Sequence, residues 1–261
     1  MNNEIHYNMS FPDYQAIDAL NSGKVRAALK SLRYMRRKEL TPEPDYNYTF
    51  EFGKAFAYAC EDIQIFNAHC AVGPTKTPTA KAWQEQLQEE PNIVLLTQTD
   101  YDLVIAMHKT ILEDEGLRHI LDGEKELTFT WEDEVTGCAM KGRCDLLVPI
   151  GPDAYHLIDV KTISDIQKFG WQIRDFKYDV QLAMYADGLR HCGKNILQVS
   201  NLFIEKEQVL PEMYLHTFND EQLSQAWDRY QDAIKAIKDA RRTGVYSGYT
   251  PPINKDILTG F

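Results

Sequence analysis

The sequence lacks several features that would place a protein in a distinct class. It has no apolar run of about 20 residues, the length that a helix needs to cross a membrane. Its first residues, MNNEIHYNMSFPDY, lack the basic stretch and following apolar stretch of a secretory leader. It also contains no internal repeat and no low-complexity linker. We therefore expect a single domain, residues 1–261, with no membrane partner.

Paired cysteines are absent as well. The five cysteines show no C-x-x-C spacing and are scattered along the chain, at Cys60, Cys70, Cys138, Cys144 and Cys192. An odd, scattered set predicts reduced thiols in a cytosolic protein. It argues against a zinc or iron–sulfur site built from cysteine.

Positive charge is scarce on average but concentrated in one segment. The chain carries 28 basic and 39 acidic residues, a net charge of −11, which on average disfavours a polyanionic partner. Residues 24–38, KVRAALKSLRYMRRK, nonetheless hold seven basic residues and no acidic one. Helical spacing would place four of them on one face, as a stripe that nucleic acid could follow: Arg26, Lys30, Arg33 and Arg37. A solvated helix face is the alternative, and the segment alone does not separate the two.

Hydrophobic periodicity predicts helices in the first part of the chain and a mixture of strands and helices in the second. We expect helices at 22–40 (capped by Ser22), 50–66, 81–90 and 99–115, with 92–98 either a short strand or the lead-in to the last of these. Strands follow at 126–131, 142–150 and 155–162, helices at 164–174 and 178–192, strands at 196–206 and 212–218, and a helix from Asn219 or Asp220 to Arg242. The pattern predicts a mixed α/β protein with a helical N-terminal part (1–120), a mixed-sheet core (121–243) and a tail (244–261).

The segment from Lys141 to Tyr185 carries the chemistry. Two strands flank the turn Gly151-Pro152-Asp153, and side chains in a strand repeat every two residues, so Asp159 and Lys161 share a face. If the strands pair as neighbours, Asp145 lies beside Asp159 on that face. The same alternation places Cys144, Leu146 and Val148 together on the opposite face.

Two carboxylates and an ammonium group in apolar strands are costly unless they are paired or bind a metal. Oxygen ligands at this density suit a hard cation such as Mg²⁺ or Mn²⁺. A lysine beside such an ion can orient or deprotonate a water molecule, or neutralise a phosphate. A buried Asp–Lys ion pair within a hairpin is the structural alternative.

In its order of motifs the sequence resembles the PD-(D/E)XK nuclease superfamily, and more closely the RecE-type exonucleases (exonuclease VIII) of phages and prophages. The likeness is carried by the basic helix ending near Tyr34, by FEFGKAFAYAC, by ELTFTWEDEVTGCAMKGRCDLL, and by IDVKTISD followed by YDVQLAMYADGL. These strings occur in family order over roughly residues 20 to 205. The resemblance implies a restriction-endonuclease-like core, with a central mixed β-sheet flanked by helices.

The resemblance also implies roles for individual residues. Asp145 and Asp159 match metal ligands, the carbonyl of Val160 a further ligand, and Lys161 the catalytic lysine. Glu126 matches an acidic position that acts through water or a second ion. Gln181 and Tyr185 match a Gln-x-x-x-Tyr motif, whose spacing puts both on one helix face for contact with a phosphate or the attacking water.

One position departs from the family pattern. A helix that opens with Gly-x-x-x-His ordinarily supplies a histidine ligand, whereas here Gly53 is followed by Ala57. Glu61 lies one turn further along and is the candidate to reach the metal instead. His69 and His108 are expected to be surface or capping residues.

As a function, the resemblance implies metal-dependent hydrolysis of phosphodiester bonds with Mg²⁺ (or Mn²⁺). It further implies processive 5′-to-3′ digestion of double-stranded DNA ends by a ring-shaped homo-oligomer, a trimer or tetramer. A single-strand annealing protein would be its partner in recombination, in the cytoplasm of a bacterial host. The alternatives are a DNA-binding or assembly protein that has lost activity with the histidine at position 57, and an endonuclease of the same superfamily.

Overall fold

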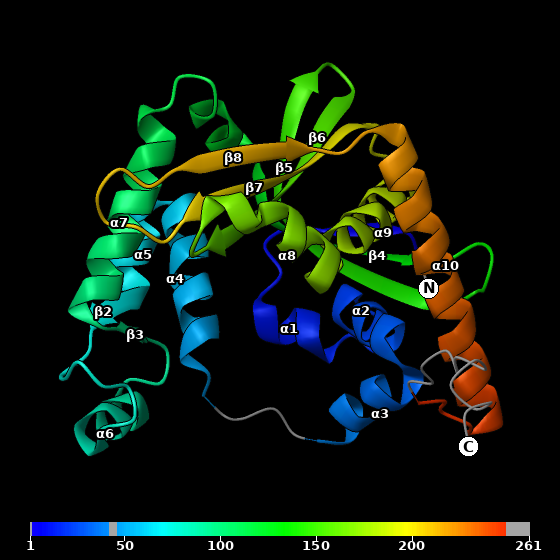
Figure 1. Cartoon of the computed structure of the whole chain (residues 1–261), viewed down its shortest axis with the longest axis horizontal. Coiled ribbons are helices and arrows are strands. Elements are labelled where there is room, and N and C mark those ends of the chain that lie inside the picture. The colour runs from blue at the N-terminus through cyan, green and yellow to red at the C-terminus, as the bar shows by residue number, and fades with distance from the viewer. Residues whose placement is uncertain (1, 42–45, 249–261) are drawn as a thin grey trace, which may run out of the picture.

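A six-stranded mixed sheet forms the centre of the protein (Figure 1). The structure is a computed structural model that describes residues 2–41 and 46–248. Within these ranges the sheet order is β1 (Glu4–His6), β4 (Glu124–Glu132), β5 (Ala139–Gly151), β6 (Ala154–Ile163), β7 (Ile196–Glu205) and β8 (Met213–Thr217). Neighbouring strands are antiparallel except β6 and β7, which are parallel. The predicted mixed α/β fold is therefore confirmed, and β1 is an addition that the sequence did not indicate.

The parallel pair requires a crossover, because parallel strands cannot be joined by a tight turn. The chain makes it through a short 3₁₀ turn (Ile166–Lys168), α8 (Phe169–Phe176) and α9 (Tyr178–His191). Helix α9 packs on one face of the sheet together with α10 (Asp220–Thr243) and α2 (Ser22–Lys30). The core on this face includes Phe129, Trp131, Leu157 and Met184.

The other face of the sheet is covered by α4 (Tyr48–Glu61) and α7 (Gln98–Glu113). Their apolar side chains meet Leu146, Ile158 and Leu202 from the sheet. In Figure 1 these helices lie to the left of the sheet, and α10 lies to its right. The sheet is thus buried on both faces, which explains its nearly continuous apolar strands.

The remaining elements belong to the N-terminal part. They are α1 (Phe11–Ala16), α3 (Leu32–Leu40), α5 (Ile63–His69), α6 (Lys81–Glu89), a 3₁₀ turn (Arg118–Asp122), and a two-stranded parallel sheet of β2 (Cys70–Val72) and β3 (Val94–Leu96). No helix in the described ranges is long and apolar enough to span a bilayer. Of the expected tail, residues 249–261 lie outside the part of the chain that the structure describes.

Two expected helices are each divided in two. The prediction of one helix over 22–40 is wrong, because Ser31 has an extended backbone (φ −175°, ψ 153°) and its hydroxyl accepts a hydrogen bond from the Tyr34 amide, which starts α3. Asn21 rather than Ser22 caps α2. In the same way Asp62 ends α4 and caps α5. Both breaks occur at residues whose side chains compete with helix formation by capping a new helix.

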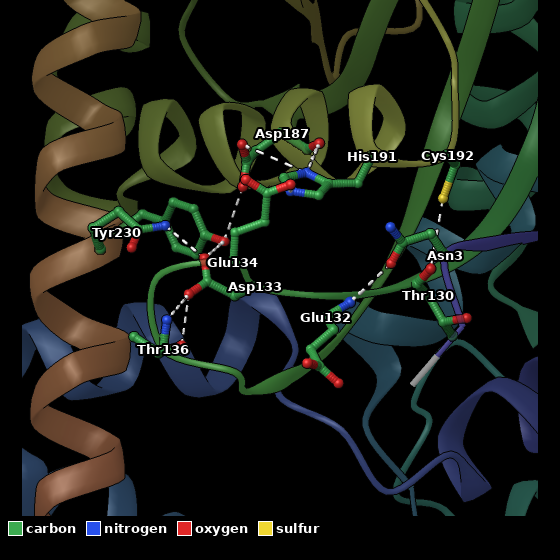
Figure 2. A network of polar contacts seen from close by, with 11 residues as sticks. Asn3, Thr130, Glu132, Asp133, Glu134, Thr136, Asp187, His191, Cys192 and Tyr230 are labelled. Atoms are coloured by element: carbon green, nitrogen blue, oxygen red, sulfur yellow. Dashed lines mark hydrogen bonds and ion pairs between the residues drawn. The ribbon is translucent and has the colours of Figure 1, made fainter.

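A polar network fixes the β4–β5 turn to the helices (Figure 2). One carboxylate oxygen of Asp133 accepts hydrogen bonds from the amide and hydroxyl of Thr136, at 2.7 and 2.6 Å. The other accepts from Gln231 Nε2 at 2.7 Å and from the Tyr230 hydroxyl at 3.2 Å. Burial raises the pKa of Asp133, but the bonds from Thr136 and Gln231 outweigh it, so the pKa lies below its ordinary value. The charged carboxylate therefore ties the turn to α10.

Packing of α9 against β4 predicts a strong effect at Gly188. A Cβ there would lie 2.7 Å from the Trp131 ring, whereas a Cβ at Gly53, also helical, would meet no atom within 4 Å. We expect Gly188→Ala to lower the free energy of unfolding by about 1–3 kcal/mol through overpacking. Gly53→Ala should raise it by about 0.5–1 kcal/mol. Thermal melting of both variants checks this, and equal effects would contradict the packing of α9 on Trp131.

Candidate active site

The hairpin of β5 and β6 brings the two aspartates together. Leu146 pairs with Ile158 and Leu147 with Leu157. One further step in this register places Asp145 across from Asp159. The side chain of Asp145 accepts a hydrogen bond from the Val160 amide at 2.7 Å, so the carboxylate of one strand is anchored on the backbone of the other.

Asp145 lies at an irregularity of the sheet. The pairing of β4 with β5 joins Lys125 to Leu146 and Leu127 to Cys144, but leaves out the intervening Glu126 and Asp145. Glu126 has a φ of 50°, in the left-handed region that non-glycine residues rarely adopt. Irregularities of this kind re-aim side chains and are frequent beside active sites.

The irregularity changes the faces of β5. Cys144 packs in the core on the α9 side, as Leu147 does, while Leu146 and Val148 pack on the α4 side. The expectation that Cys144 shares a face with Leu146 and Val148 is therefore wrong. The side chains of β5 therefore stop alternating between the two faces of the sheet at Asp145, a residue of the candidate site.

Asp159 lies in β6 with only 1% of its surface exposed. Its Oδ1 accepts a hydrogen bond from Gln181 Nε2 at 3.0 Å, and its Oδ2 accepts one from Asn201 Nδ2, also at 3.0 Å. The ammonium of Lys161 lies 2.6 Å from Oδ2. Both oxygens are held by donors, which is what allows a carboxylate to be buried in an apolar sheet.

Asn201 was not predicted as a site residue. It stands on β7, where it pairs directly with Asp159 in the parallel ladder. The sequence signal was an asparagine inside the apolar run ILQVSNLFIE. The role of Asn201 depends on which strand lies next to β7, and the local sequence pattern does not reveal the strand order.

Electrostatics disfavour a second negative charge beside Asp159. Burial raises the pKa of Asp145 to about 8, and the charges of Asp159 and Glu126 add to the effect of burial. Burial lowers the pKa of Lys161, but the two aspartates outweigh it, so the pKa of the lysine lies above its ordinary value. Lys161 is therefore protonated and balances Asp159, whereas Asp145 is protonated at neutral pH unless a further cation is bound.

Two buried oxygens beside this pair are unsatisfied. Gln181 Oε1 and Asn201 Oδ1 have no hydrogen-bond partner within the described residues, although the amide nitrogens of both side chains bind Asp159. Buried acceptors without a donor are unfavourable and point to a bound ion or water. Together with the Asp145 carboxyl group, whose charged form a cation would favour, they fit a hydrated divalent cation held by Asp145, Asp159 and the Val160 carbonyl. One or two carboxylates are the usual number for Mg²⁺.

The other two proposed ligands differ in position, because Glu126 lies close enough to Asp145 to raise its pKa, whereas Glu61 is exposed. Glu126 forms an ion pair with Arg143 at 2.6 Å. Glu61 is exposed at the end of α4, where its backbone carbonyl accepts a hydrogen bond from Lys125. No group of three or more His, Cys, Asp and Glu residues placed to hold a metal occurs in residues 2–41 and 46–248. Ligation by Glu126 and Glu61 stays a prediction.

Helix α4 passes over the Asp145 side of the site. Burial raises the pKa of Cys60 to about 12, and the next contribution comes from Asp145, so the thiol lies near that carboxylate. Ala57, one turn earlier, is half-buried. His69 is exposed at the end of α5, as expected, but His108 is buried in α7 and burial lowers its pKa, so its expected surface position is wrong.

Helix α9 presents Gln181 and Tyr185 on one face, as their spacing predicts. Gln181 reaches Asp159, whereas the Tyr185 hydroxyl pairs with Ser22 Oγ at 3.1 Å and is only 4% exposed. The Tyr185 ring packs edge-on against Phe129. Tyr185 thus ties the start of α2 to the site, and its proposed contact with a phosphate stays a prediction.

The four basic residues are split by the break at Ser31. Arg26 on α2 lies near the site, because its guanidinium donates to the Phe176 carbonyl at 3.2 Å and lies 6.0 Å from the Tyr178 ring centre. Lys30 lies over the Tyr34 ring. Arg33 and Arg37 stand on α3, beyond the break. The expected single stripe on one helix is therefore not formed, and a role of the four residues in DNA binding stays a prediction.

Comparison with known proteins defines the class of this fold. The sequence matches a family described as a PDDEXK-like domain of unknown function (DUF3799) over residues 33–251. The chain belongs to this family, and the inferred superfamily is confirmed. Membership of the RecE-type group stays a prediction.

A crystal structure of a protein from Eubacterium rectale, named "Putative exonuclease", has the same fold with a TM-score of 0.67. The two are 15% identical, and the match covers 98% of this chain and 99% of that one. No curated protein matches the sequence.

The raised pKa of Asp145 predicts a pH-dependent stability when chelator keeps divalent metal away. In the unfolded chain an aspartate has a pKa of about 3.9. Between about pH 4 and about pH 8 the folded protein therefore binds a proton that the unfolded chain has released, and the free energy of unfolding falls as pH rises.

The side chain at position 145 of the Asp145→Asn variant does not bind or release a proton. The free energy of unfolding of this variant, relative to the wild type, should therefore increase as pH rises through this range. We expect a gain of about 1–3 kcal/mol, less than the full pKa difference implies, because Asp145 is half-buried and solvent screens it. Melting in EDTA from pH 5 to pH 8.5 measures the effect. Asp153→Asn, in the exposed hairpin turn, is the control and should show no trend; a flat Asp145→Asn difference would contradict the electrostatic account.

Divalent metal should stabilise the folded protein through the same carboxylates. A ligand that binds only the folded state at 100 times its Kd contributes about 2.7 kcal/mol. We expect Mn²⁺ to raise the melting temperature of the wild type and of Asp153→Asn, and not that of Asp145→Asn or Asp159→Asn. Absence of any rise in the wild type would favour a purely structural ion pair.

Proposed function

We propose that the protein is a divalent-metal-dependent deoxyribonuclease. The observation that carries this proposal is the buried Asp159–Lys161 pair beside a second carboxylate, Asp145, whose pKa is about 8. The chain supplies a cation for only one of these two carboxyl groups, on the framework of a PDDEXK-like family. A purely structural ion pair would not need the second carboxyl group, Asp145, beside it.

In this proposal the residues of the site fall into metal ligands and positioning residues. A divalent cation, Mg²⁺ or Mn²⁺, supplies Lewis acidity toward the scissile phosphate when it is bound. Asp145, Asp159 and the Val160 carbonyl would hold it. Gln181 and Asn201 fix the orientation of the Asp159 carboxylate through their amide hydrogens. Both are positioning residues in this proposal.

Lys161 remains protonated while its pKa lies above the ordinary value. In that form it can donate hydrogen bonds to a phosphate oxygen or to the attacking water and offset the charge that develops on the phosphate. A role as general base requires the negative charge around it to be reduced first, because the two aspartates are what raise its pKa. We therefore assign Lys161 an electrostatic role.

We further propose a 5′-to-3′ exonuclease that acts on double-stranded DNA ends in recombination. Support comes from the RecE-like order of motifs in the sequence and from the name of the Eubacterium rectale structure, "Putative exonuclease". Arg26 contacts the Phe176 carbonyl and the Tyr178 ring, and it provides a positive charge for the DNA backbone beside the site. A ring-shaped trimer or tetramer and a single-strand annealing partner belong to the same proposal.

The second candidate is a DNA-binding or assembly protein without hydrolytic activity. One observation favours it: Ala57 replaces the histidine ligand, and Glu61, the proposed substitute, has its side chain exposed. Retention of Asp145, Asp159 and Lys161 favours the nuclease.

Release of label from an end-labelled linear duplex, with Mg²⁺, Mn²⁺ or EDTA, tests the nuclease. We expect metal-dependent release by the wild type and a loss of about 100-fold or more in Asp159→Asn and Lys161→Ala, the usual effect of removing such groups. Asp153→Asn, in the exposed hairpin turn, and Lys109→Ala, an exposed charge on α7, are controls and should keep the wild-type rate. Equal rates in all four variants would overturn the proposal.

Substrate topology separates the two kinds of nuclease. An exonuclease leaves closed circular DNA intact, whereas an endonuclease nicks it. Blocking either the 5′ or the 3′ ends of a linear duplex then gives the polarity, and degradation that persists with blocked 5′ ends would contradict the proposed direction.

A further inference from the structure

Helix α8 exposes two large aromatic side chains next to the candidate active site. Trp171 is 50% exposed and Phe176 is 40% exposed. The opposite side of the helix is anchored, because Ile173 is buried and Phe169 packs on Tyr214 with ring centres 4.4 Å apart. Single exposed aromatics are ordinary, but two that lie in contact beside a reactive site indicate an interaction surface.

The two rings continue a series that ends at Lys161. Trp171 contacts Phe176 edge-on, with ring centres 5.9 Å apart. Phe176 contacts Tyr178 at 5.6 Å with the planes inclined by 32°. Tyr178 in turn lies under the Lys161 ammonium, which is 5.0 Å from the ring centre. A surface that begins at Trp171 therefore leads directly to the lysine that faces the two carboxylates.

The backbone at this point is held in an unusual conformation. Lys177, between α8 and α9, has φ 57° and ψ 44°, a left-handed conformation that is unfavourable for a side chain other than glycine. It allows α9 to start immediately after α8, so that Phe176 and Tyr178 lie in contact across the junction. Arg26 fixes the junction from α2 through its bond to the Phe176 carbonyl. The same conformation caps the C-terminus of α8, where the Lys177 amide donates to the Ile173 carbonyl, so it sets the angle between the two helices.

The charge around the rings suits a polyanion. The acids that flank residues 166–178, Asp165 and Asp179, are paired with Lys168 and Arg229. Arg174 and Lys177 then stand against one acid, Asp175, in a chain whose net charge is −11. Arg26 adds a further positive charge next to Tyr178. A protein partner could cover the aromatic rings alone, but aromatic faces bordered by cations are the combination that binds single-stranded nucleic acid.

We propose that Trp171 and Phe176 form a stacking surface for unpaired bases of the DNA strand whose phosphate is at Lys161. The proposal rests on the nuclease function and specifies its substrate as a strand end with unpaired bases. Bases inside a duplex have no free face, so stacking on these rings selects frayed or overhanging ends. Tyr178, between the surface and Lys161, positions the ammonium toward the backbone of the same strand.

Binding of labelled oligonucleotides without hydrolysis tests the stacking surface. The probes are a duplex with a four-nucleotide single-stranded overhang that contains 2-aminopurine, and the same duplex with blunt ends. Ca²⁺ replaces Mg²⁺, and a gel confirms that the strands stay intact. We expect the wild type to quench 2-aminopurine and to bind the overhang more tightly than the blunt end.

Trp171→Ala and Phe176→Ala should weaken binding of the overhang by about 5- to 100-fold and remove the quenching. Binding of the blunt duplex should change little, and Trp171→Phe and Phe176→Tyr should restore most of the loss because they keep a ring. Phe50→Ala is the matched control, because Phe50 is a 62% exposed phenylalanine at the start of α4. Melting curves confirm that each variant folds.

Wild-type affinity and quenching in Trp171→Ala and Phe176→Ala would overturn the stacking surface while the nuclease assay stands unaffected. Quenching by a wild type that releases no label would support the stacking surface and overturn the nuclease. If the two substitutions instead change the molecular mass in light scattering and leave binding of the overhang unchanged, the rings form a contact between copies of the chain and the proposal is wrong.

Discussion

The burial of the Asp159 carboxylate in the middle of the sheet is the constraint on which the site depends. A charge in an apolar sheet is unfavourable by several kcal/mol or more unless donors surround it. Lys161 on the same strand, Asn201 on the neighbouring strand and Gln181 on the crossover helix supply these donors. The requirement therefore fixes the register of β6 on β7 and the orientation of α9. The stability of the fold and the geometry of the site have the same origin.

The donors that satisfy Asp159 leave the rest of the site unsatisfied. Asp145 receives one backbone hydrogen bond, and its pKa of about 8 shows that the charged form is disfavoured in the folded chain. Glu126 holds a left-handed backbone at the adjoining irregularity. A chain selected for stability alone would have removed both features, and sites that retain strain and unbalanced charge are characteristic of function. The imbalance is what a cation would correct.

The local parts of the site could be predicted from sequence. The two-residue period placed Asp159 and Lys161 on one face, and the four-residue spacing placed Gln181 and Tyr185 on one side of a helix. Asn201 could not be found in this way, since its role depends on a parallel pairing with Asp159, 42 residues earlier in the chain, a long-range contact with no local signal. The irregularity at Asp145 was hidden for a related reason: apolar residues on both faces of a doubly buried sheet do not reveal a change of face.

Helix α2 shows how the surrounding fold completes the site. The family match begins at residue 33, so Ser22 and Arg26 lie before it. Both nevertheless contact the central region, Ser22 through the Tyr185 hydroxyl and Arg26 through the Phe176 carbonyl. One short helix thus anchors the middle of α9 and the junction that precedes it. A substitution in α2 would therefore act on the site from outside the matched range, through Tyr185 and Phe176. In the proposed nuclease, such a substitution would alter how a DNA strand reaches Lys161 without altering Lys161 itself.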